Sequence, residues 1–331
     1  MRNLLLPPVS QLPREACRRD ARSLPGERLR RVTAGALALF LAVLCPAAGL
    51  VSPVVFRKTV AEVHLTLVAT DGRGRPVEDL SSDDFTVTDQ GQQVAILGIE
   101  RATDLPLDLG IVVDLSDSTR RSWEQTRAAA GRLLSGLMRP DDRLFVVAFD
   151  SQIELQREVA SPASLTEILL EPGRGGQTAL YDALAAACQD PYRQALRQPR
   201  RSALIVFTDG EDNYSAHSLY DAIAEAQRAD VAIYTVSLHS HRWQYAGDDA
   251  LRLLTTQTGG RDFVVSGEKE LDKAVAAIAD ELRNSYAIFY RPPRSMLKQR
   301  FRVVRLQPLS HNLRLRSRAG YYPLPEEGEQ P

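Results

Sequence analysis

Apolar and polar positions follow different rhythms in different parts of this chain. Between residues 57 and 104, apolar side chains recur at every second position, most clearly over 63–68 and 85–87. This period is typical of strands with one buried face. A Gly-rich polar cluster at 71–76 indicates a turn, and 94–97 is expected to form one further strand. The pattern predicts a small N-terminal β module, which is too short to be stable alone and should pack against another part of the protein.

From residue 105 to residue 284, continuous apolar runs alternate with segments of helical period. Runs that are apolar throughout indicate strands buried on both faces, so the pattern predicts an α/β fold with a doubly wound, mostly parallel sheet. Ser122, with Gln125 three residues on, suggests a capping box at the start of the first helix. The expected strands are 107–113, 144–149, 153–159, 203–208, 231–237 and 263–265, and the expected helices are 122–138, 164–170, 179–189, 218–229, 248–258 and 268–283.

The segment 285–322 returns to a strand-like pattern, with expected strands at 286–290, 301–306 and 313–317. We expect these strands to complete the N-terminal module. A small β-sandwich-like module would then be built from both flanks of the α/β domain. The remaining residues, 323–331, are acidic and rich in proline, which predicts a mobile tail.

The N-terminal segment 1–50 has the composition of an export signal. Its first 31 residues carry eight arginines against three acidic residues, and an apolar run over 34–44 and then small residues follow. Basic, apolar and small is the order of a secretory signal peptide. The apolar run is shorter than the roughly 20 residues of a spanning helix. We therefore expect a periplasmic or secreted protein, anchored to the membrane through 34–44 if the leader stays uncleaved.

Overall composition is ordinary for a globular protein, with 44% hydrophobic and 25% charged residues among 331. The formal net charge of −1 gives no reason to expect binding to nucleic acid. Two of the three cysteines lie in the expected leader. Cys188 then stands alone, so no disulfide framework is predicted.

Five oxygen-bearing side chains at three separated places form a candidate metal site. Asp114, Ser116 and Ser118 follow one apolar run, Thr178 follows a Gly-rich loop, and Asp209 ends another apolar run. Loops at the carboxyl ends of parallel strands meet in one crevice, where ligands bind. Hydroxyls and carboxylates without sulfur or imidazole suit a hard cation, namely Mg²⁺, Ca²⁺ or Mn²⁺. The competing interpretation is that the first three residues only cap a helix.

The charge balance of these five residues predicts what such an ion would do. Two aspartates against a divalent cation, with uncharged hydroxyls beside them, leave the ion attractive to a further anion. We expect the partner to be a protein that supplies an Asp or Glu carboxylate. Asp182, one helical turn after Thr178, is expected to stabilise its helix start through the helix dipole or, alternatively, to orient a loop.

These motifs resemble a known family. Asp-x-Ser-x-Ser after an apolar strand, the run Gly-Gly-x-Thr-Ala-Leu-Tyr-Asp, and Thr-Asp-Gly are similar to the von Willebrand factor A domain with its metal-ion-dependent adhesion site, and the five residues match its five positions. The flanks resemble the VWFA-related Acidobacterial domain proteins, through Gly74-Arg75-Pro76-Val77 before the domain and Ser285-Tyr286 after it. The resemblance implies extracytoplasmic adhesion or complex assembly without catalysis. It also implies that water mediates some aspartate contacts to the ion.

Two alternatives remain open at this stage. A metal-assisted hydrolase would use the same ion to activate water and would need a general base, for which Glu211 and Asp212 are the local candidates. The fold could also be kept as a metal-free scaffold. The chain lacks the G-x-G-x-x-G, P-loop and G-x-S-x-G patterns, which disfavours dinucleotide enzymes, P-loop NTPases and serine hydrolases. No catalytic residue is predicted.

Overall fold

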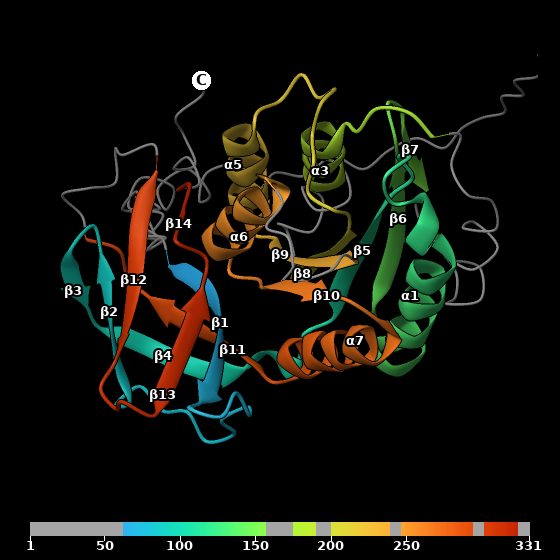
Figure 1. The fold of residues 1–331 in the computed structure, drawn as a ribbon. Helices are drawn as coiled ribbons and strands as arrows, with labels where there is room; N and C mark the ends of the chain where they lie inside the picture. The colour runs from blue at the N-terminus through green and yellow to red at the C-terminus, as the bar shows by residue number, and fades with distance from the viewer. Residues whose placement is uncertain (1–61, 157–174, 190–199, 239–245, 294–300, 324–331) are drawn as a thin grey trace, which may run out of the picture. The chain divides into compact units, whose positions relative to one another are not determined.

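The computed structural model describes residues 62–156, 175–189, 200–238, 246–293 and 301–323. All of them belong to one compact unit, Lys58–Pro331 (Figure 1). The predicted leader 1–50, the expected helix 164–170 and the tail beyond residue 323 lie outside the described residues.

A six-stranded sheet in the order β10-β9-β8-β5-β6-β7 forms the centre of the α/β domain. Neighbouring strands from β10 to β6 pair in parallel, and only the edge strand β7 runs antiparallel to its neighbour β6. The strands are β5 (Leu107–Asp114), β6 (Arg143–Phe149), β7 (Ile153–Gln156), β8 (Arg201–Phe207), β9 (Ala232–Leu238) and β10 (Asp262–Val265).

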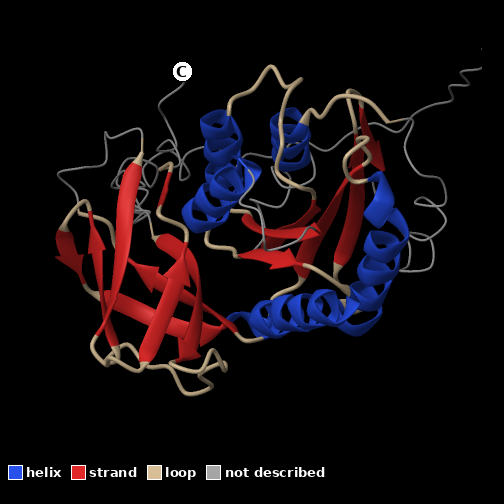
Figure 2. Cartoon of the chain, in the orientation of Figure 1, coloured by secondary structure: helices blue, strands red, loops and turns tan. Residues whose placement is uncertain are grey.

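Helices cover both faces of this sheet, as Figure 2 shows. Every residue of β5 is buried, and consecutive side chains point to opposite faces. Ile111 therefore packs with the helices α1 and α7, whereas Val112 packs with α3, α5 and α6. The predicted α/β fold with a mostly parallel sheet is confirmed. The helices are α1 (Trp123–Leu137), α3 (Leu180–Gln189), α5 (Leu219–Ala229), α6 (Ala246–Thr258) and α7 (Glu268–Arg283), with single 3₁₀ turns η1 (Ala102–Asp104) and η2 (Arg120–Ser122).

Two four-stranded sheets form the second part of the fold, in the orders β13-β1-β11-β4 and β14-β12-β2-β3. Both sheets mix strands from the two ends of the described chain, since β1 pairs with β11 and β13, and β2 pairs with β12. The sandwich-like module built from both flanks is thus confirmed. The strands are β1 (Val63–Asp71), β2 (Phe85–Asp89), β3 (Gln92–Val94), β4 (Ile96–Arg101), β11 (Ser285–Tyr290), β12 (Arg302–Pro308), β13 (Leu313–Ser317) and β14 (Gly320–Tyr321).

An ion pair lies inside the apolar core of this β sandwich. Arg302 and Asp89 are both 0% exposed. The guanidinium approaches Asp89 Oδ1 at 2.9 Å, and the hydroxyls of Tyr290 and Tyr321 donate to Asp89 Oδ2 at 3.3 and 2.9 Å. Burial and the nearby carboxylate raise the pKa of both tyrosines. An aspartate from the N-terminal flank is thereby held by three residues from the C-terminal flank.

Two details of the sequence-based assignment were wrong. The expected strand 94–97 is split at Ala95 into β3 and β4, which enter different sheets. Ser122 forms no capping box, because its hydroxyl donates to Thr119 O at 2.9 Å and no side chain caps α1. A 3₁₀ turn precedes α1 instead. A capping box does occur at α5, between Ser218 and Asp221.

None of the described helices combines the length and the apolar character that crossing a bilayer requires. The run 34–44, proposed as a potential anchor, lies outside the described residues.

Candidate functional site

The first site loop begins where β5 ends. Asp114 is the last residue of β5, and its side chain is buried with 2% exposure. The Ser116 amide donates to Asp114 Oδ1 at 2.9 Å, and Thr119 Oγ1 donates to Asp114 O at 2.8 Å. These bonds fold the chain back on itself. They bring the hydroxyls of Ser116 and Ser118 to 3.2 Å from each other.

The second carboxylate oxygen of Asp114 contacts the neighbouring strand. Because β5 and β8 are parallel with Val113 opposite Phe207, the next residues, Asp114 and Thr208, also lie side by side. Thr208 Oγ1 donates to Asp114 Oδ2 at 2.7 Å. Asp209 follows directly and is partly buried. The second predicted aspartate is therefore brought to the same edge of the sheet.

The electrostatics of Asp114 reflect this crowding. Burial raises the pKa of the Asp114 carboxyl to about 6, and the negative charge of Asp209 adds to the rise. The hydrogen bonds from Ser116 and Thr208 oppose the rise without cancelling it. Asp114 forms no ion pair with any arginine or lysine that the structure describes. A buried carboxylate near a second one, without a cation, gains stability when a cation joins it.

The Gly-rich loop brings Thr178 to this edge. Gly175 adopts a φ of +77°, and a Cβ atom there would come within 2.2 Å of Asp117 Oδ1. The loop therefore lies directly against the turn that carries Ser116 and Ser118, and only glycine fits. Thr178 itself is buried, with 3% exposure.

Hydrogen bonds tie Thr178 to the loop that follows Asp209. The Thr178 amide donates to Asn213 Oδ1 at 2.8 Å. Its carbonyl accepts from the amides of Asn213 and Tyr214 at 3.0 and 3.1 Å. The three loops that carry the five predicted residues thus contact one another at the carboxyl ends of β5 and β8.

The donor chemistry of this edge fits a hard divalent cation. The two carboxylates and three hydroxyls belong to three loops that contact one another, and these are oxygen ligands of the kind that Mg²⁺, Ca²⁺ and Mn²⁺ accept. Among the residues that the structure describes, no group of three or more His, Cys, Asp or Glu side chains could hold a metal ion.

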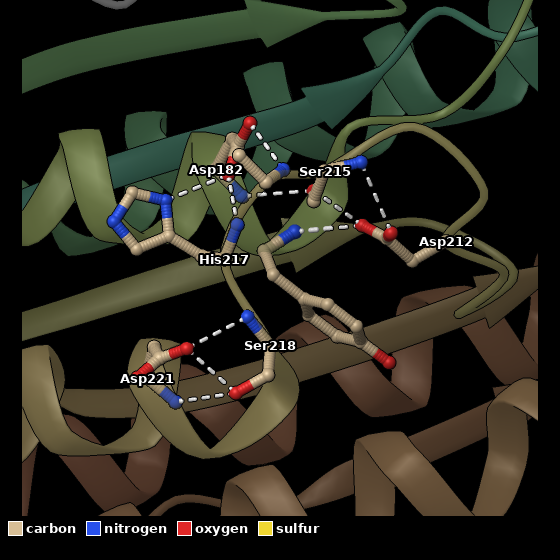
Figure 3. Close-up of polar contacts among 8 residues, drawn as sticks. Asp182, Asp212, Ser215, His217, Ser218 and Asp221 are labelled. Atoms are coloured by element: carbon tan, nitrogen blue, oxygen red, sulfur yellow. Dashed lines mark hydrogen bonds and ion pairs between the residues drawn. The ribbon is translucent and has the colours of Figure 1, made fainter.

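Two further aspartates fix the long loop between β8 and α5 (Figure 3). Asp182 accepts from the amides of Ala216 and His217 at 3.0 and 2.8 Å and from the His217 ring at 2.7 Å. Although burial pushes the pKa of Asp182 upward, these bonds outweigh it and lower the pKa. Of the two roles expected for Asp182, orienting a loop is the one that the hydrogen bonds support.

Asp212 holds the other end of this loop. Its Oδ2 accepts from the Tyr181 amide at 3.0 Å and from Ser215 Oγ at 2.6 Å. Ser215 Oγ accepts in turn from the Asp182 amide at 3.0 Å. The loop is thus bonded to the first turn of α3 along most of its length.

Sequence reasoning missed two residues that support the site. Thr208 orients the Asp114 carboxylate, and Asn213 holds both sides of the Thr178 peptide. The signal for Thr208 was its place beside Asp209 at the end of a strand. Nothing in the sequence pattern distinguishes Asn213 from an ordinary polar loop residue.

Comparison with solved structures returns proteins of low sequence identity. Proximal thread matrix protein 1 from the mussel byssus is 17% identical, with a TM-score of 0.47, and the match covers 57% of this chain and 49% of that chain. The present chain therefore spans about half the length of that protein. A further structure of the same protein has a zinc-occupied metal-ion-dependent adhesion site.

Two bacterial structures are similar over nearly their whole length. An aerotolerance-related membrane protein from Bacteroides fragilis is 18% identical over 53% of this chain and 98% of its own, with a TM-score of 0.42. The vWF domain of the type V pili tip protein Mfa5 from Porphyromonas gingivalis is 14% identical over 54% of this chain and 95% of its own, with a TM-score of 0.42.

No curated protein matches the chain. The family model of the von Willebrand factor type A domain matches residues 108–277, which is about half of the chain and includes all three site loops. This match rests on the sequence and agrees with the parallel sheet and its two helical layers. The chain belongs to the von Willebrand factor type A domain family.

Proposed function

We propose that this protein is an extracytoplasmic adhesion or complex-assembly module that binds a divalent cation and, through it, an acidic residue of a partner protein. The observation that carries the proposal is the environment of Asp114. Its carboxylate is buried, is hydrogen-bonded by Ser116 and Thr208, is repelled by the charge of Asp209, and forms no ion pair with a basic residue in the described part of the chain. Von Willebrand factor A domains mediate protein–protein interactions, which agrees with this role.

The five predicted residues would hold the ion, with Mg²⁺ as the expected cation and Ca²⁺ or Mn²⁺ as alternatives. Asp114, Ser116 and Ser118 would contribute from the first loop, Thr178 from the second and Asp209 from the third. When bound, the ion would supply an incompletely neutralised positive charge that attracts a carboxylate. The hydrogen bonds to Asp114 and Thr178 would hold the three loops in place around the ion.

Charge near the site favours an anionic partner. Arg120 and Arg121 follow Ser118 closely, and both are exposed. Neither forms an ion pair with any residue that the structure describes. Two exposed positive charges beside a bound cation would attract an Asp or Glu side chain and disfavour a basic partner.

The location and the domain limits are part of the same proposal. The basic and apolar segment 1–50 would export the protein to the periplasm or the cell exterior, with anchoring through 34–44 if it is retained. The A domain would extend over 105–284, and the segments 57–104 and 285–322 would form the β sandwich that presents it.

The metal-binding part can be tested by calorimetric titration of the full chain with Mg²⁺. The wild-type protein should bind one ion, and Asp114→Asn and Thr178→Ala should abolish the heat of binding. Partner binding should then be lost in EDTA and restored by Mg²⁺. Binding that continues unchanged in excess EDTA would falsify the proposed function.

The hydrolase alternative needs a free general base near the ion. Asp212 accepts bonds from Tyr181 and Ser215 and is committed to holding the loop. Glu211 is exposed, and its amide donates to Asp209 Oδ1 at 3.2 Å. Turnover of phosphoester or peptide panels with Mg²⁺ or Mn²⁺ that disappears in Glu211→Gln would replace adhesion by catalysis. A titration without heat at any Mg²⁺ concentration would favour the metal-free scaffold.

A further inference from the structure

The exposed large hydrophobic side chains in the described part of the α/β domain both lie in the segment that follows Asp209. In the described part of that domain, only Tyr214 and Tyr220 are large, hydrophobic and exposed, at 55% and 71%. They follow Asp209 by five and eleven positions. The other three such residues of the described chain, Leu97, Val303 and Leu309, belong to the β sandwich.

The main chain of Tyr214 is bonded directly to a proposed metal ligand. Its amide donates to the Thr178 carbonyl at 3.1 Å, and the preceding Asn213 bonds both the amide and the carbonyl of Thr178. The backbone of Tyr214 therefore lies directly against Thr178, one of the five proposed ligands. Tyr220 lies in the first turn of α5, on the other end of the same connection.

Several hydrogen bonds hold the connection between the two tyrosines. Asp212 accepts from the amide and the hydroxyl of Ser215, and Asp182 accepts from the amides of Ala216 and His217, as Figure 3 shows. Its last residue, Ser218, forms a reciprocal capping box with Asp221. The loop thus presents two aromatic rings to solvent on a backbone that loses little freedom on binding.

A single exposed tyrosine is ordinary on a soluble protein, and it carries no argument by itself. Two of them at the two ends of one hydrogen-bonded connection are different, because aromatic side chains on rigid backbones are the commonest energetic centres of protein interfaces. The loop supplies large contact area at low entropic cost. It is therefore suited to contact the part of the partner protein that surrounds the acidic residue at the ion.

We infer that Tyr214 and Tyr220 form a second contact of the adhesion site, which selects partners whose acidic residue is accompanied by an aromatic or large aliphatic side chain. This inference rests on the proposed function, since the acidic residue is what the ion would bind. An extended peptide advances about 3.3 Å per residue, so the test places the apolar side chain at several short spacings from the acidic one.

The test uses the full chain in Mg²⁺ and three synthetic peptides immobilised at high density. All three have a Gly-Ser background. The first contains a single Asp, the second contains Asp and a Phe two positions away, and the third contains Asn and the same Phe. We expect the Asp-Phe peptide to bind roughly tenfold more tightly than the Asp peptide. Tyr214→Ala should remove this preference and leave binding of the Asp peptide unchanged, whereas Tyr214→Phe should keep it.

Leu309→Ala serves as the matched control, because it truncates a similarly exposed side chain in the β sandwich. Circular dichroism verifies that each variant is folded, and Tyr220→Ala provides a second truncation at the start of α5. Equal binding of the Asp and Asp-Phe peptides, across spacings of one to four residues, would overturn the inference and leave the proposed function standing. Metal-independent binding of the Asn-Phe peptide as tight as that of Asp-Phe would also overturn it. No binding of any peptide to Mg²⁺-loaded protein would contradict both.

Discussion

Two buried aspartates, one in each part of the fold, have opposite electrostatic environments. Asp89 in the β sandwich is fully buried and meets the Arg302 guanidinium and two tyrosine hydroxyls. Asp114 at the edge of the central sheet is almost as deeply buried, at 2% exposure, but meets an amide, a threonine hydroxyl and the repulsion of Asp209. The first carboxylate has its cation built into the chain, and the second has none among the residues that the structure describes.

The difference between these two environments indicates a different role for each aspartate. A buried charge that finds its counter-charge within the chain joins distant segments, and the Asp89 cluster joins the two flanks of the A domain. A buried charge without one leaves the chain incomplete until an ion arrives from solution. The same residue type therefore has a structural role in one region and a proposed binding role in the other.

Breaking the sandwich pair should have the largest effect. Asp89→Asn leaves the Arg302 cation buried without a counter-charge, so the free energy of unfolding should fall by about 3–5 kcal/mol. Urea denaturation followed by circular dichroism measures this, with and without Mg²⁺. The loss should be the same in both conditions, because the cluster has no part in the proposed ion site.

The double variant Asp89→Leu/Arg302→Met provides the control for this experiment. It removes both charges together, so it should lose clearly less stability than Asp89→Asn alone. A double variant as unstable as the single one would mean that packing, and not the uncompensated charge, causes the loss.

The corresponding change at the ion site should have the opposite sign. Without metal at pH 7.5, Asp114→Asn should stabilise the protein by on the order of 2 kcal/mol, because it removes a carboxylate that burial makes unfavourable when ionised. The same variant should lose all stabilisation by Mg²⁺, which thermal denaturation at increasing Mg²⁺ would measure. If Asp114→Asn destabilises the metal-free protein as Asp89→Asn does, the contrast between the two regions is mistaken.

The pH dependence of the metal-free protein should reveal the same carboxylate. The pKa of Asp114 is raised to about 6 from an ordinary 3.8, so between these values the folded state holds a proton that the unfolded state has released. Stability should therefore decrease by up to about 1.4 kcal/mol per pH unit from pH 4 to pH 6, and this contribution should level off above pH 6. Stabilisation by Mg²⁺ should grow over the same interval, since the ion competes with the proton.

Urea titrations from pH 4.5 to pH 7.5, on wild type and Asp114→Asn, test this dependence. Taking the difference between the two proteins removes the contribution of all other titrating groups. A difference that stays constant across the interval would contradict the raised pKa.

Local sequence patterns predicted the central sheet better than they predicted the sandwich. The strands of the A domain are continuous apolar runs, which predict a parallel sheet. Because Asp114 and Asp209 both follow such runs, they are expected at the same edge of the sheet, where the carboxyl ends of the strands lie. The split at Ala95 could not be seen, because alternation over 94–97 is the same whether one strand or two are formed. The choice depends on the C-terminal strands β11 and β12, which lie about 200 residues away.

The candidate site was predicted from its side chains but not from its supports. Its five residues stand out because carboxylates and hydroxyls end apolar strands or open helices. Asn213 and His217 act through contacts with Thr178 and Asp182, more than 30 residues away in sequence. Such contacts depend on the folded loop, and Ser122 likewise followed the capping pattern while bonding elsewhere.

The smallest change in the free energy of unfolding is expected for an aspartate near the protein surface. Asp182 is partly exposed and holds the loop between β8 and α5 through the amides of Ala216 and His217. Asp182→Asn keeps one acceptor oxygen and removes the charge, so the free energy of unfolding should change by less than about 1 kcal/mol. The local effect should be larger, since hydrogen exchange at these two amides should accelerate while exchange in the β sandwich stays the same. Mg²⁺ affinity should stay within about twofold, because Asp182 contacts none of the proposed ligands. A large loss of Mg²⁺ binding in this variant would mean that the loop between β8 and α5 helps to form the ion site.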